Sequence, residues 1–232
     1  MAIFLDTGKI EDVEKYLKMG IIRGVTTNPT ILLKAGVTGG RDAIKKRSVE
    51  IAALIKPLPI SVEVTTNDLE QMISQAREYA QWADNINVKI TVHGPNGEIE
   101  NFEAVHLLET KYNVRVNMTA MMSAQQCLLG ALAGATYVSL FGGRVNNMGF
   151  NCVEEIKKAR KVLDDQKLPA KIIVGSTREV LNVIEWLEAG AHIVTVVPDI
   201  LKGMIIHPYS KETVQMFLDD AKKADLLLDK SR

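Results

Sequence analysis

Residues 85–90 read Asn-Ile-Asn-Val-Lys-Ile, a short apolar run with a cation inside it. Side chains alternate between the two faces of a strand, so Lys89 is expected to point away from Val88 and Ile90. Lysine is almost never fully buried without a partner or a purpose. Burial disfavours the charged ammonium and leaves a free amine that can attack a carbonyl and form a Schiff base. For one isolated lysine, a side chain that extends to water from the strand end is the simpler alternative.

On both sides of this run, short β-branched segments alternate with longer helical patterns. Strands are predicted at Ile3–Asp6, Ile22–Thr27, Ile60–Thr65, Asn85–Ile90, Val114–Thr119, Thr136–Phe141, Lys171–Ser176 and Ile193–Val197. Helices are predicted at Glu11–Met19, Asp42–Ile55, Leu69–Trp82, Ala124–Ala133, Val153–Leu163 and Glu179–Glu188, with a further helical segment at about 211–228. This alternation predicts an α/β protein, a single-domain (β/α)8 TIM barrel over residues 1–232. A doubly wound sheet is the alternative, but no glycine-rich dinucleotide fingerprint follows the first strand.

The composition of the 232 residues is that of an ordinary globular protein, with zero formal net charge. It gives no reason to expect a nucleic acid or an anionic membrane as a partner. Residues 1–6 lack a basic region, so no signal peptide is predicted, and no apolar run approaches membrane-spanning length. Cys127 and Cys152 lie far apart and are expected to be reduced thiols of a cytoplasmic protein. Four histidines without paired spacing give no indication of a zinc site.

Polar or ionisable side chains stand at or just after the C-terminal ends of seven successive predicted strands. Along the chain they are Asp6, Thr27, Asn28, Glu63, Lys89, Asn117, Thr119, Ser139, Arg144, Ser176 and Arg178, with Phe141 at the end of the sixth strand. Active sites of (β/α)8 barrels form at this end of the strands. Each residue alone is explained equally well as a satisfied core polar group. Their shared placement instead indicates a catalytic mouth.

The carboxylates beside Lys89 suggest how an imine would form and react. An amine that condenses with a ketone must expel water, which requires proton delivery to oxygen. We expect Glu63, with Thr119, to hold and activate that water. We expect Asp6 to take a proton from a substrate hydroxyl, the step that breaks a carbon–carbon bond in a retro-aldol reaction.

The other polar residues of the mouth are typical of sugar recognition. Asn28, Asn117 and Ser139 are neutral hydrogen-bonding groups that suit sugar hydroxyls. Arg144 and Arg178 could hold a tetrahedral oxyanion, with help from Ser176 and a helix N-terminus. For either arginine alone, a surface ion pair is the simpler alternative.

Several of these segments resemble one known family, the small transaldolases. The resemblance lies in Phe4–Thr7, Gly24–Thr30, Val62–Val64, Val88–Ile90, Val116–Thr119 and Gly143-Arg144, and it extends from residue 3 to about residue 210. Its most specific element is the Thr-Thr-Asn-Pro run at residues 26–29. The family has a (β/α)8 fold and forms a Schiff base on the fourth strand.

The resemblance implies roles for individual residues. It implies Lys89 as the Schiff-base lysine, Asp6 as the acid/base carboxylate, and Glu63 with Thr119 as the pair that handles water. It implies substrate contacts from Thr27, Asn28, Asn117, Ser139 and Phe141, and an anion site from Arg144, Ser176 and Arg178. Sugar phosphates or sugar sulfonates are the implied substrates, and no metal or organic cofactor is implied. Homo-oligomeric rings of five or ten subunits are expected, with the segment Thr213–Leu228 packing on a neighbouring subunit.

Two positions favour transfer of a dihydroxyacetone unit over its release. Fructose-6-phosphate aldolases resemble the same family but usually carry Gln where Glu63 stands and Tyr where Phe141 stands. A tyrosine hydroxyl can help protonate and release the donor fragment, whereas phenylalanine cannot. Release of free dihydroxyacetone is the nearest alternative reaction. A barrel isomerase or epimerase of phosphosugars and a non-catalytic sugar-anion sensor are more distant alternatives.

The chain departs from the family at the predicted anion site. The usual Ser-Pro-Phe-Val-Gly-Arg reads Ser-Leu-Phe-Gly-Gly-Arg at residues 139–144, and Asn146 and Asn147 replace a common acidic pair. We expect Gly142 to give this loop a different path and the loss of two acids to make it less negative. The sequence resembles a branch that acts on 6-deoxy-6-sulfofructose. Ordinary drift within a phosphate loop is the alternative explanation.

Overall fold

Eight parallel strands form a closed barrel in chain order, which confirms the predicted fold class. A computed structural model describes residues 2–229 of the chain, and the side chains as far as residue 225. The strands are β1 (Ile3–Asp6), β2 (Val25–Thr26), β3 (Ile60–Glu63), β4 (Ile86–Thr91), β5 (Val116–Met121), β6 (Tyr137–Leu140), β7 (Lys171–Val174) and β8 (Ile193–Val196). The first and last residues of each strand lie within three residues of the predicted ones. The inward and outward faces of the strands therefore follow the expected alternation.

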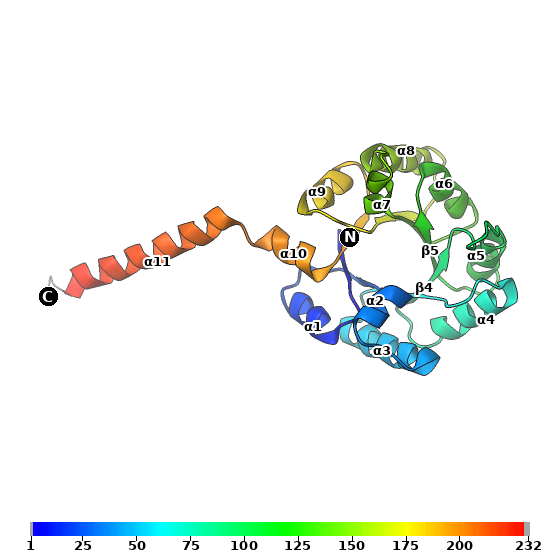
Figure 1. Ribbon diagram of the computed structural model, residues 1–232, viewed down its shortest axis with the longest axis horizontal. Helices are drawn as coiled ribbons and strands as arrows, with labels where there is room; N and C mark the ends of the chain where they lie inside the picture. Colours follow the sequence, from blue (N-terminus) through cyan, green and yellow to red (C-terminus); the bar gives the residue numbers. More distant parts are fainter. Residues whose placement is uncertain (1, 230–232) are drawn as a thin grey trace.

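Helices surround the strands in a ring (Figure 1). The long connections contain α1 (Ile10–Lys18), α3 (Gly40–Ile55), α4 (Leu69–Ala80), α5 (Asn101–Thr110), α6 (Ala124–Leu132), α8 (Cys152–Asp165) and α9 (Val180–Glu188). Three shorter helices follow β2, β6 and β8, namely α2 (Pro29–Lys34), α7 (Gly142–Asn147) and α10 (Pro198–Ile205). No helix was predicted from the sequence at α2, α5, α7 or α10. Two of the three short helices, α2 and α7, supply side chains to the candidate site.

The starts of several helices follow from single capping side chains. Asp68 accepts a hydrogen bond from the backbone N–H of Gln71, and Ser123 accepts one from Gln126, as their positions before α4 and α6 suggest. At α2 the side chain of Asn28 accepts from the backbone N–H of Ile31, and proline occupies the first helical position. The same Asn-Pro pair therefore ends β2 and begins a helix at the barrel mouth.

Strand β2 is much shorter than predicted, and a close contact inside the barrel accompanies this. A Cβ at Gly24 would lie 2.6–2.8 Å from the ring of Phe4, so only glycine admits that ring here. The residues before Val25 connect to β1 through backbone hydrogen bonds such as Arg23 N to Ile3 O. The contact between Gly24 and the Phe4 ring thus comes directly before the two-residue strand β2.

Part of the barrel interior, on one side below the cavity, is apolar. Phe4, Tyr137, Ile173 and Ile193 form a separate buried cluster contributed by β1, β6, β7 and β8. The larger core lies between the outer face of the strands and the helices, and it includes Leu5, Val62, Val88 and Met118. Because inward and outward residues alternate, β1, β6, β7 and β8 each contribute to both cores.

Helix α11 (Pro208–Asp229) extends away from the barrel (Figure 1). All of its described side chains, from residue 208 to residue 225, are exposed. Tyr209, Val214, Phe217 and Leu218 are among them, each more than half exposed. Within the part of the chain that the structure describes, no helix combines the length and apolar character that a bilayer crossing would require.

Candidate active site

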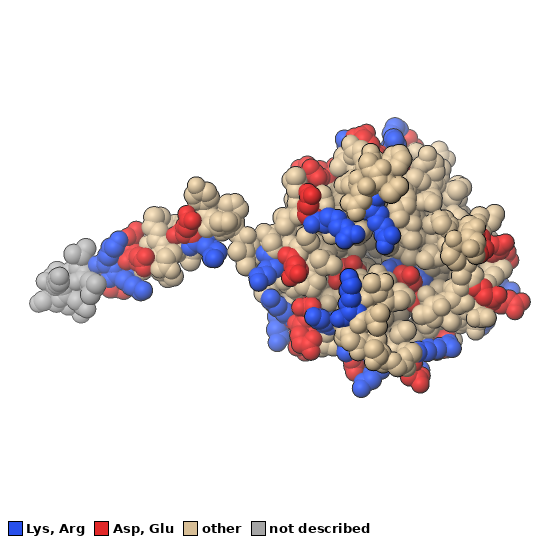
Figure 2. Space-filling model, in the orientation of Figure 1, with Lys and Arg blue, Asp and Glu red and all other residues tan. Residues whose placement is uncertain are grey.

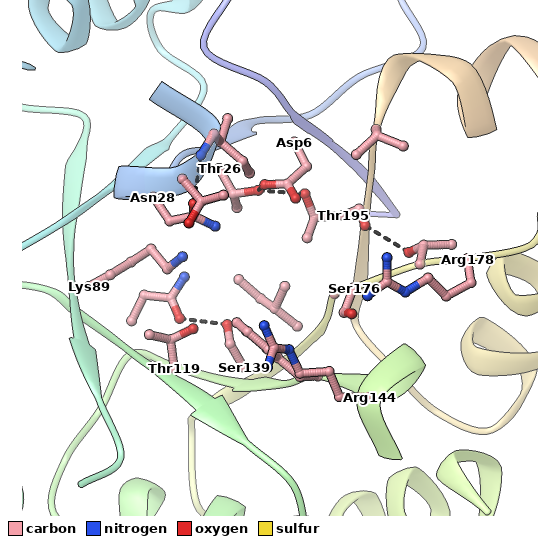
Figure 3. A pocket seen from close by; sticks show the side chains of 18 of the residues that line it. Asp6, Thr26, Asn28, Lys89, Thr119, Ser139, Arg144, Ser176, Arg178 and Thr195 are labelled. Atoms are coloured by element: carbon pink, nitrogen blue, oxygen red, sulfur yellow. Dashed lines mark hydrogen bonds between the residues drawn. The ribbon is translucent and has the colours of Figure 1, made fainter. Parts of the chain in front are cut away.

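A cavity of about 220 Å³ opens at the C-terminal ends of the strands. Ten of the twelve predicted site residues line it, namely Asp6, Asn28, Lys89, Asn117, Thr119, Ser139, Phe141, Arg144, Ser176 and Arg178. Figure 3 shows their side chains pointing toward a common space from several different strands. The other two, Glu63 and Thr27, do not line the cavity. Glu63 forms an ion pair with Lys89, and Thr27 is described below. The alternation read from the sequence therefore brings these groups together.

Lys89 is held inside the barrel and does not extend to water. The residue is 4% exposed. Its Nζ donates a hydrogen bond to the backbone carbonyl of Thr27 at 3.0 Å and lies 3.1 Å from Oε2 of Glu63. Strand register explains this pairing, because Lys89 stands beside Glu63 of β3 on one side and Asn117 of β5 on the other. The carboxylate is within proton-transfer distance of the amine.

Asp6 belongs to a chain of short hydrogen bonds across β1, β2 and β8. Thr26 donates to Oδ1 of Asp6 at 2.6 Å, and Thr195 lies 2.6 Å from the same threonine hydroxyl (Figure 3). Burial raises the pKa of Asp6, while the bond from Thr26 and the charge of Lys89 act in the opposite direction. A carboxylate with a raised pKa is a better proton acceptor than an ordinary aspartate, which suits a general base.

The Thr-Thr-Asn-Pro run at residues 26–29 contributes both side chains and a backbone carbonyl to the site. Thr26 points inward and bonds Asp6. Thr27, which was predicted as a substrate contact, does not line the cavity: its hydroxyl donates to the carbonyl of Ser61, and its backbone carbonyl accepts from Lys89. The alternation of strand side chains places Thr26, and not Thr27, on the inner face. Because the side-chain oxygen of Asn28 caps α2, its amide nitrogen is left to donate into the cavity.

Asn117 is fixed by hydroxyl groups on both sides. Its amide nitrogen donates to Oγ of Ser61 at 3.1 Å, and its amide oxygen accepts from Ser139 at 2.6 Å. This arrangement leaves the second amide hydrogen of Asn117 for a ligand. The structure thus adds Ser61 as a support for the amide that the sequence had assigned to substrate hydroxyls.

Thr119 presents an unpaired hydroxyl to the cavity. Its Oγ1 is buried and has no hydrogen-bond partner among the described residues. The next residue, Ala120, has a left-handed backbone (φ 62°), and the pairing of β5 with β6 shifts register between Met118 and Met121. A bulge of this kind re-aims neighbouring side chains. A buried hydroxyl without a partner is suited to hold a water or a substrate oxygen.

Arg144 and Arg178 stand together at one side of the mouth (Figure 3). Neither makes an ion pair within the described part of the chain, so the surface ion-pair alternative does not hold here. The guanidinium of Arg144 lies over the ring of Phe141, 5.8 Å from its centroid. A Cβ at residue 143 would collide with the carbonyl of Ser176, so Gly143 brings α7 against the loop after β7. These contacts fix both sides of the predicted anion site.

The loop at residues 142–147 is shaped by packing behind the site. Gly142 is buried and does not line the cavity. A Cβ there would meet Cys152, Trp186 and Val174 at 2.7–2.8 Å, so this glycine is required by packing behind the site. The side chain of Asn146 accepts a hydrogen bond from the backbone N–H of Cys152 at the start of α8. Neither residue therefore sets the shape of the space where an anion would bind.

Nine of the nineteen residues that line the cavity were not predicted as site residues, and three of these are polar side chains with a clear place in the site. Thr26 and Thr195 follow the same inward alternation as Asp6, so the signal was present in β2 and β8. Lys34 also lines the cavity, and it lies on α2. Pro29 immediately after a potential capping asparagine was the available sign of that helix.

The cysteines lie away from this chemistry. Cys127 and Cys152 are free and buried, and burial raises the pKa of each thiol to about 12. Both thiols are thus protonated and unreactive at neutral pH. Among the described residues, no group of three His, Cys, Asp or Glu side chains is arranged to hold a metal ion.

Comparisons with known proteins agree on one family. A family model described as Transaldolase/Fructose-6-phosphate aldolase matches residues 3–231. A probable transaldolase of Dehalococcoides mccartyi is 37% identical over 222 residues, covering 96% of this chain and 98% of that protein. One from Carboxydothermus hydrogenoformans is 39% identical over 220 residues, covering 95% and 97%. A thiamine phosphate pyrophosphorylase from Pyrococcus furiosus, 13% identical with a TM-score of 0.59 over 84% of this chain and 85% of that one, shares only the fold.

Proposed function

The chain belongs to the transaldolase/fructose-6-phosphate aldolase family, and on that premise we propose that it acts as a Schiff-base transaldolase. It moves a dihydroxyacetone unit from a 6-substituted ketose, either fructose 6-phosphate or 6-deoxy-6-sulfofructose, to an aldose such as glyceraldehyde 3-phosphate. The observation that carries this proposal is the buried amine of Lys89, which lies 3.1 Å from a carboxylate and faces a cavity with a second carboxylate, Asp6.

The first half of the reaction forms and cleaves the imine. The Lys89 amine attacks the ketose carbonyl, and proton delivery through Glu63 releases the carbonyl oxygen as water. Asp6 then accepts the proton of the C4 hydroxyl while the bond between C3 and C4 breaks. The aldehyde leaves, and the bond electrons remain on the three-carbon unit as an enamine of Lys89. The raised pKa of Asp6 supports its part as the base.

The second half reverses these steps on a different aldehyde. The enamine attacks the acceptor carbonyl, and Asp6 returns its proton to the new hydroxyl. Water then hydrolyses the imine, which restores the free amine of Lys89. The unpaired hydroxyl of Thr119 is suited to hold that water. The same carboxylates thus serve in both directions.

Sugar recognition divides between neutral and charged groups. The amide nitrogens of Asn28 and Asn117 and the hydroxyl of Ser139 meet the hydroxyl groups of the ketose. Arg144 and Arg178 hold the phosphate or sulfonate at its far end. Both arginines line the cavity and are free of carboxylate partners among the described residues, which supports this assignment.

Transfer is favoured over release by the residues around the enamine. Phe141 lines the cavity without a hydroxyl that could protonate the three-carbon unit. Glu63 supplies a carboxylate where an aldolase would carry an amide. Enamine that is not protonated persists until an acceptor arrives, which is the condition for transfer. Release of free dihydroxyacetone is the outcome that would favour the aldolase reaction instead.

The deciding experiment is covalent trapping. Borohydride reduction in the presence of fructose 6-phosphate, and separately of its sulfonate analogue, should attach a reduced ketose or dihydroxyacetone unit to Lys89 alone, as read by peptide mass spectrometry. Lys89→Met should abolish the adduct and lower turnover by about 10³-fold or more, because the covalent route is lost. Trapping at another lysine, or turnover that survives in the variant, contradicts the mechanism.

For the assembly we propose a homo-oligomeric ring of five or ten subunits in the cytoplasm. The apolar side chains of α11, including Val214, Phe217 and Leu218, are exposed on a helix that leaves its own barrel, which supports packing on a neighbouring subunit. Both cysteines are free, as expected for a protein of a reducing compartment. Mass measured by light scattering, before and after truncation at residue 207, tests the ring.

A further inference from the structure

Lys34 is a cation at the cavity that the proposed mechanism does not use. It is the last residue of α2, and it lines the cavity together with Thr30 and Ile31 of the same helix. The three- and four-residue spacing of these positions places them on one helix face. Because α2 is fixed at its start by the Asn28 cap and Pro29, Lys34 is mounted on the same rigid unit as the Thr-Thr-Asn-Pro run.

No carboxylate holds the Lys34 ammonium. It forms no ion pair within 4.0 Å among the described residues. It also borders a second cavity, lined by Lys9, Asp12 and Asp199, which shares Asp6 and Ile31 with the first. Lys34 thus stands on the wall between the two cavities, exposed and free to turn toward a ligand anion.

The charges around the first cavity favour an anionic ligand. The cations at the cavity are Lys34, Lys89, Arg144 and Arg178, and the carboxylates are Asp6 and Glu63. With all six ionised, four positive and two negative charges leave a net charge of two positive. A phosphate ester carries about two negative charges at pH 7, whereas a sulfonate carries one. Figure 2 shows basic side chains on opposite sides of the hollow at the barrel mouth.

We propose that Lys34 is a third cationic contact to the substrate anion, and that it favours a dianionic phosphate over a monoanionic sulfonate. This proposal rests on the proposed transaldolase function and places an element of donor specificity on α2, opposite Arg144 and Arg178. Arg144 and Arg178 bind either anion from one side of the mouth, and the second charge of a phosphate draws Lys34 from the other. Preference between the donors is therefore set from α2.

The kinetic test compares Lys34→Met with two variants. Lys9→Met is the matched control, because Lys9 lines only the second cavity. Lys34→Arg keeps the charge and should restore the native behaviour. In Lys34→Met we expect KM to rise about 10-fold for fructose 6-phosphate, the loss of one charge-assisted contact. Coulomb energy is proportional to charge, so KM for the sulfonate analogue should rise only about 3-fold. Uncharged fructose should be unaffected, and so should kcat.

A binding measurement separates this proposal from the proposed function. Inorganic phosphate should raise the unfolding temperature of the native protein and of Lys9→Met, and it should do so less for Lys34→Met. This holds whether or not the native protein turns over either ketose. Equal protection of both variants, or equal rises in KM for charged and uncharged donors, would overturn the role of Lys34. Loss of all turnover in the native protein, with the phosphate effect intact, would overturn only the transaldolase assignment.

Discussion

On β1, β6, β7 and β8 the lower half of the barrel interior is apolar, whereas the upper half carries the polar cavity. In the lower half Phe4, Tyr137, Ile173 and Ile193 form a buried apolar cluster. Two residues further along their strands the chain places Asp6, Ser139, Gly175 and Thr195, all of which line the cavity. Residues two positions apart on a strand lie on the same face, so both members of each pair, such as Phe4 and Asp6, point into the barrel. The first member packs in the apolar cluster, and the second lines the cavity. Packing and chemistry are thus arranged in sequence along these four strands, with Ile173 at the boundary because it also lines the cavity.

The two halves also differ in what burial does to free energy. Burial of the apolar side chains stabilises the folded state by removing hydrocarbon from water. Burial of Asp6 works the other way, because it disfavours the ionised carboxylate and raises the pKa. The hydrogen bond from Thr26 and the charge of Lys89 reduce that effect without removing it. The apolar half therefore stabilises the folded state, whereas ionisation of Asp6 in the upper half destabilises it.

The largest effects should come from the carboxylates of the upper half. Asp6→Ala should let the substrate imine accumulate while cleavage slows, and Glu63→Ala should slow imine formation itself. Loss of a positioned acid or base lowers a rate by about 10²- to 10⁴-fold. Single-turnover kinetics with borohydride quenching distinguishes the two blocks. If both variants stall at the same step, the division of labour between these carboxylates is wrong.

Substitution in the lower half should give the reverse result. Ile193→Ala should lower the free energy of unfolding by about 2–5 kcal/mol, because it removes buried hydrocarbon and leaves a cavity. The kcat of the folded fraction should stay close to that of the native protein. Urea unfolding and active-site titration with borohydride measure the two quantities. A large fall in kcat at full occupancy of the native state would show that the halves are not independent.

The cost of ionising Asp6 can be measured through pH. Its folded pKa is raised, so between the unfolded and folded values the folded state binds more protons, and the free energy of unfolding falls as pH rises. Asp6→Asn should therefore be more stable than the native protein at pH 7, and the gain should shrink at about pH 4, near the pKa of an unfolded aspartate. Urea unfolding at both pH values measures it, with exposed Asp225→Asn as the control. A gain independent of pH would assign the effect to packing.

The smallest expected effect is a change in the reaction product, from transfer toward release of the three-carbon unit. Phe141→Tyr places a phenol at the cavity, where it can protonate the enamine and release the three-carbon unit. Free dihydroxyacetone should increase in the absence of an acceptor, while trapping at Lys89 is unchanged. Enzymatic assay of dihydroxyacetone measures this. Rapid release already in the native protein would mean that Phe141 does not control the partition.

Sequence reasoning was strongest where a period governs the structure. The alternation of short strands and helices identified the barrel, and the period of two identified Asp6, Lys89 and Ser139 as inward residues. It was weakest where a residue acts through its backbone or its packing. Thr27 presents a carbonyl that any residue would carry. Gly142 is fixed by neighbours from α8, β7 and α9, which no local pattern could indicate.

The missed residues show a related limit. Thr195 and Thr26 were accessible to the same alternation argument that found Asp6. Lys34 was not, because its relevance depends on where α2 turns after Pro29 and on the absence of a carboxylate near it among the described residues. A lysine five residues beyond the motif looks like any solvated surface cation in sequence. Its place in three dimensions distinguishes it.

The hydrogen bond from Lys89 to the carbonyl of Thr27 has a consequence for protein engineering. A main-chain acceptor survives every substitution at its own position, so residue 27 can be varied without deleting the anchor of the reactive amine. Only a change in the course of the turn, such as loss of the Asn28 cap or of Pro29, would displace it. Because Thr27 is fully buried and its hydroxyl bonds the Ser61 carbonyl, position 27 should accept only small side chains, and positions 28 and 29 should be left untouched.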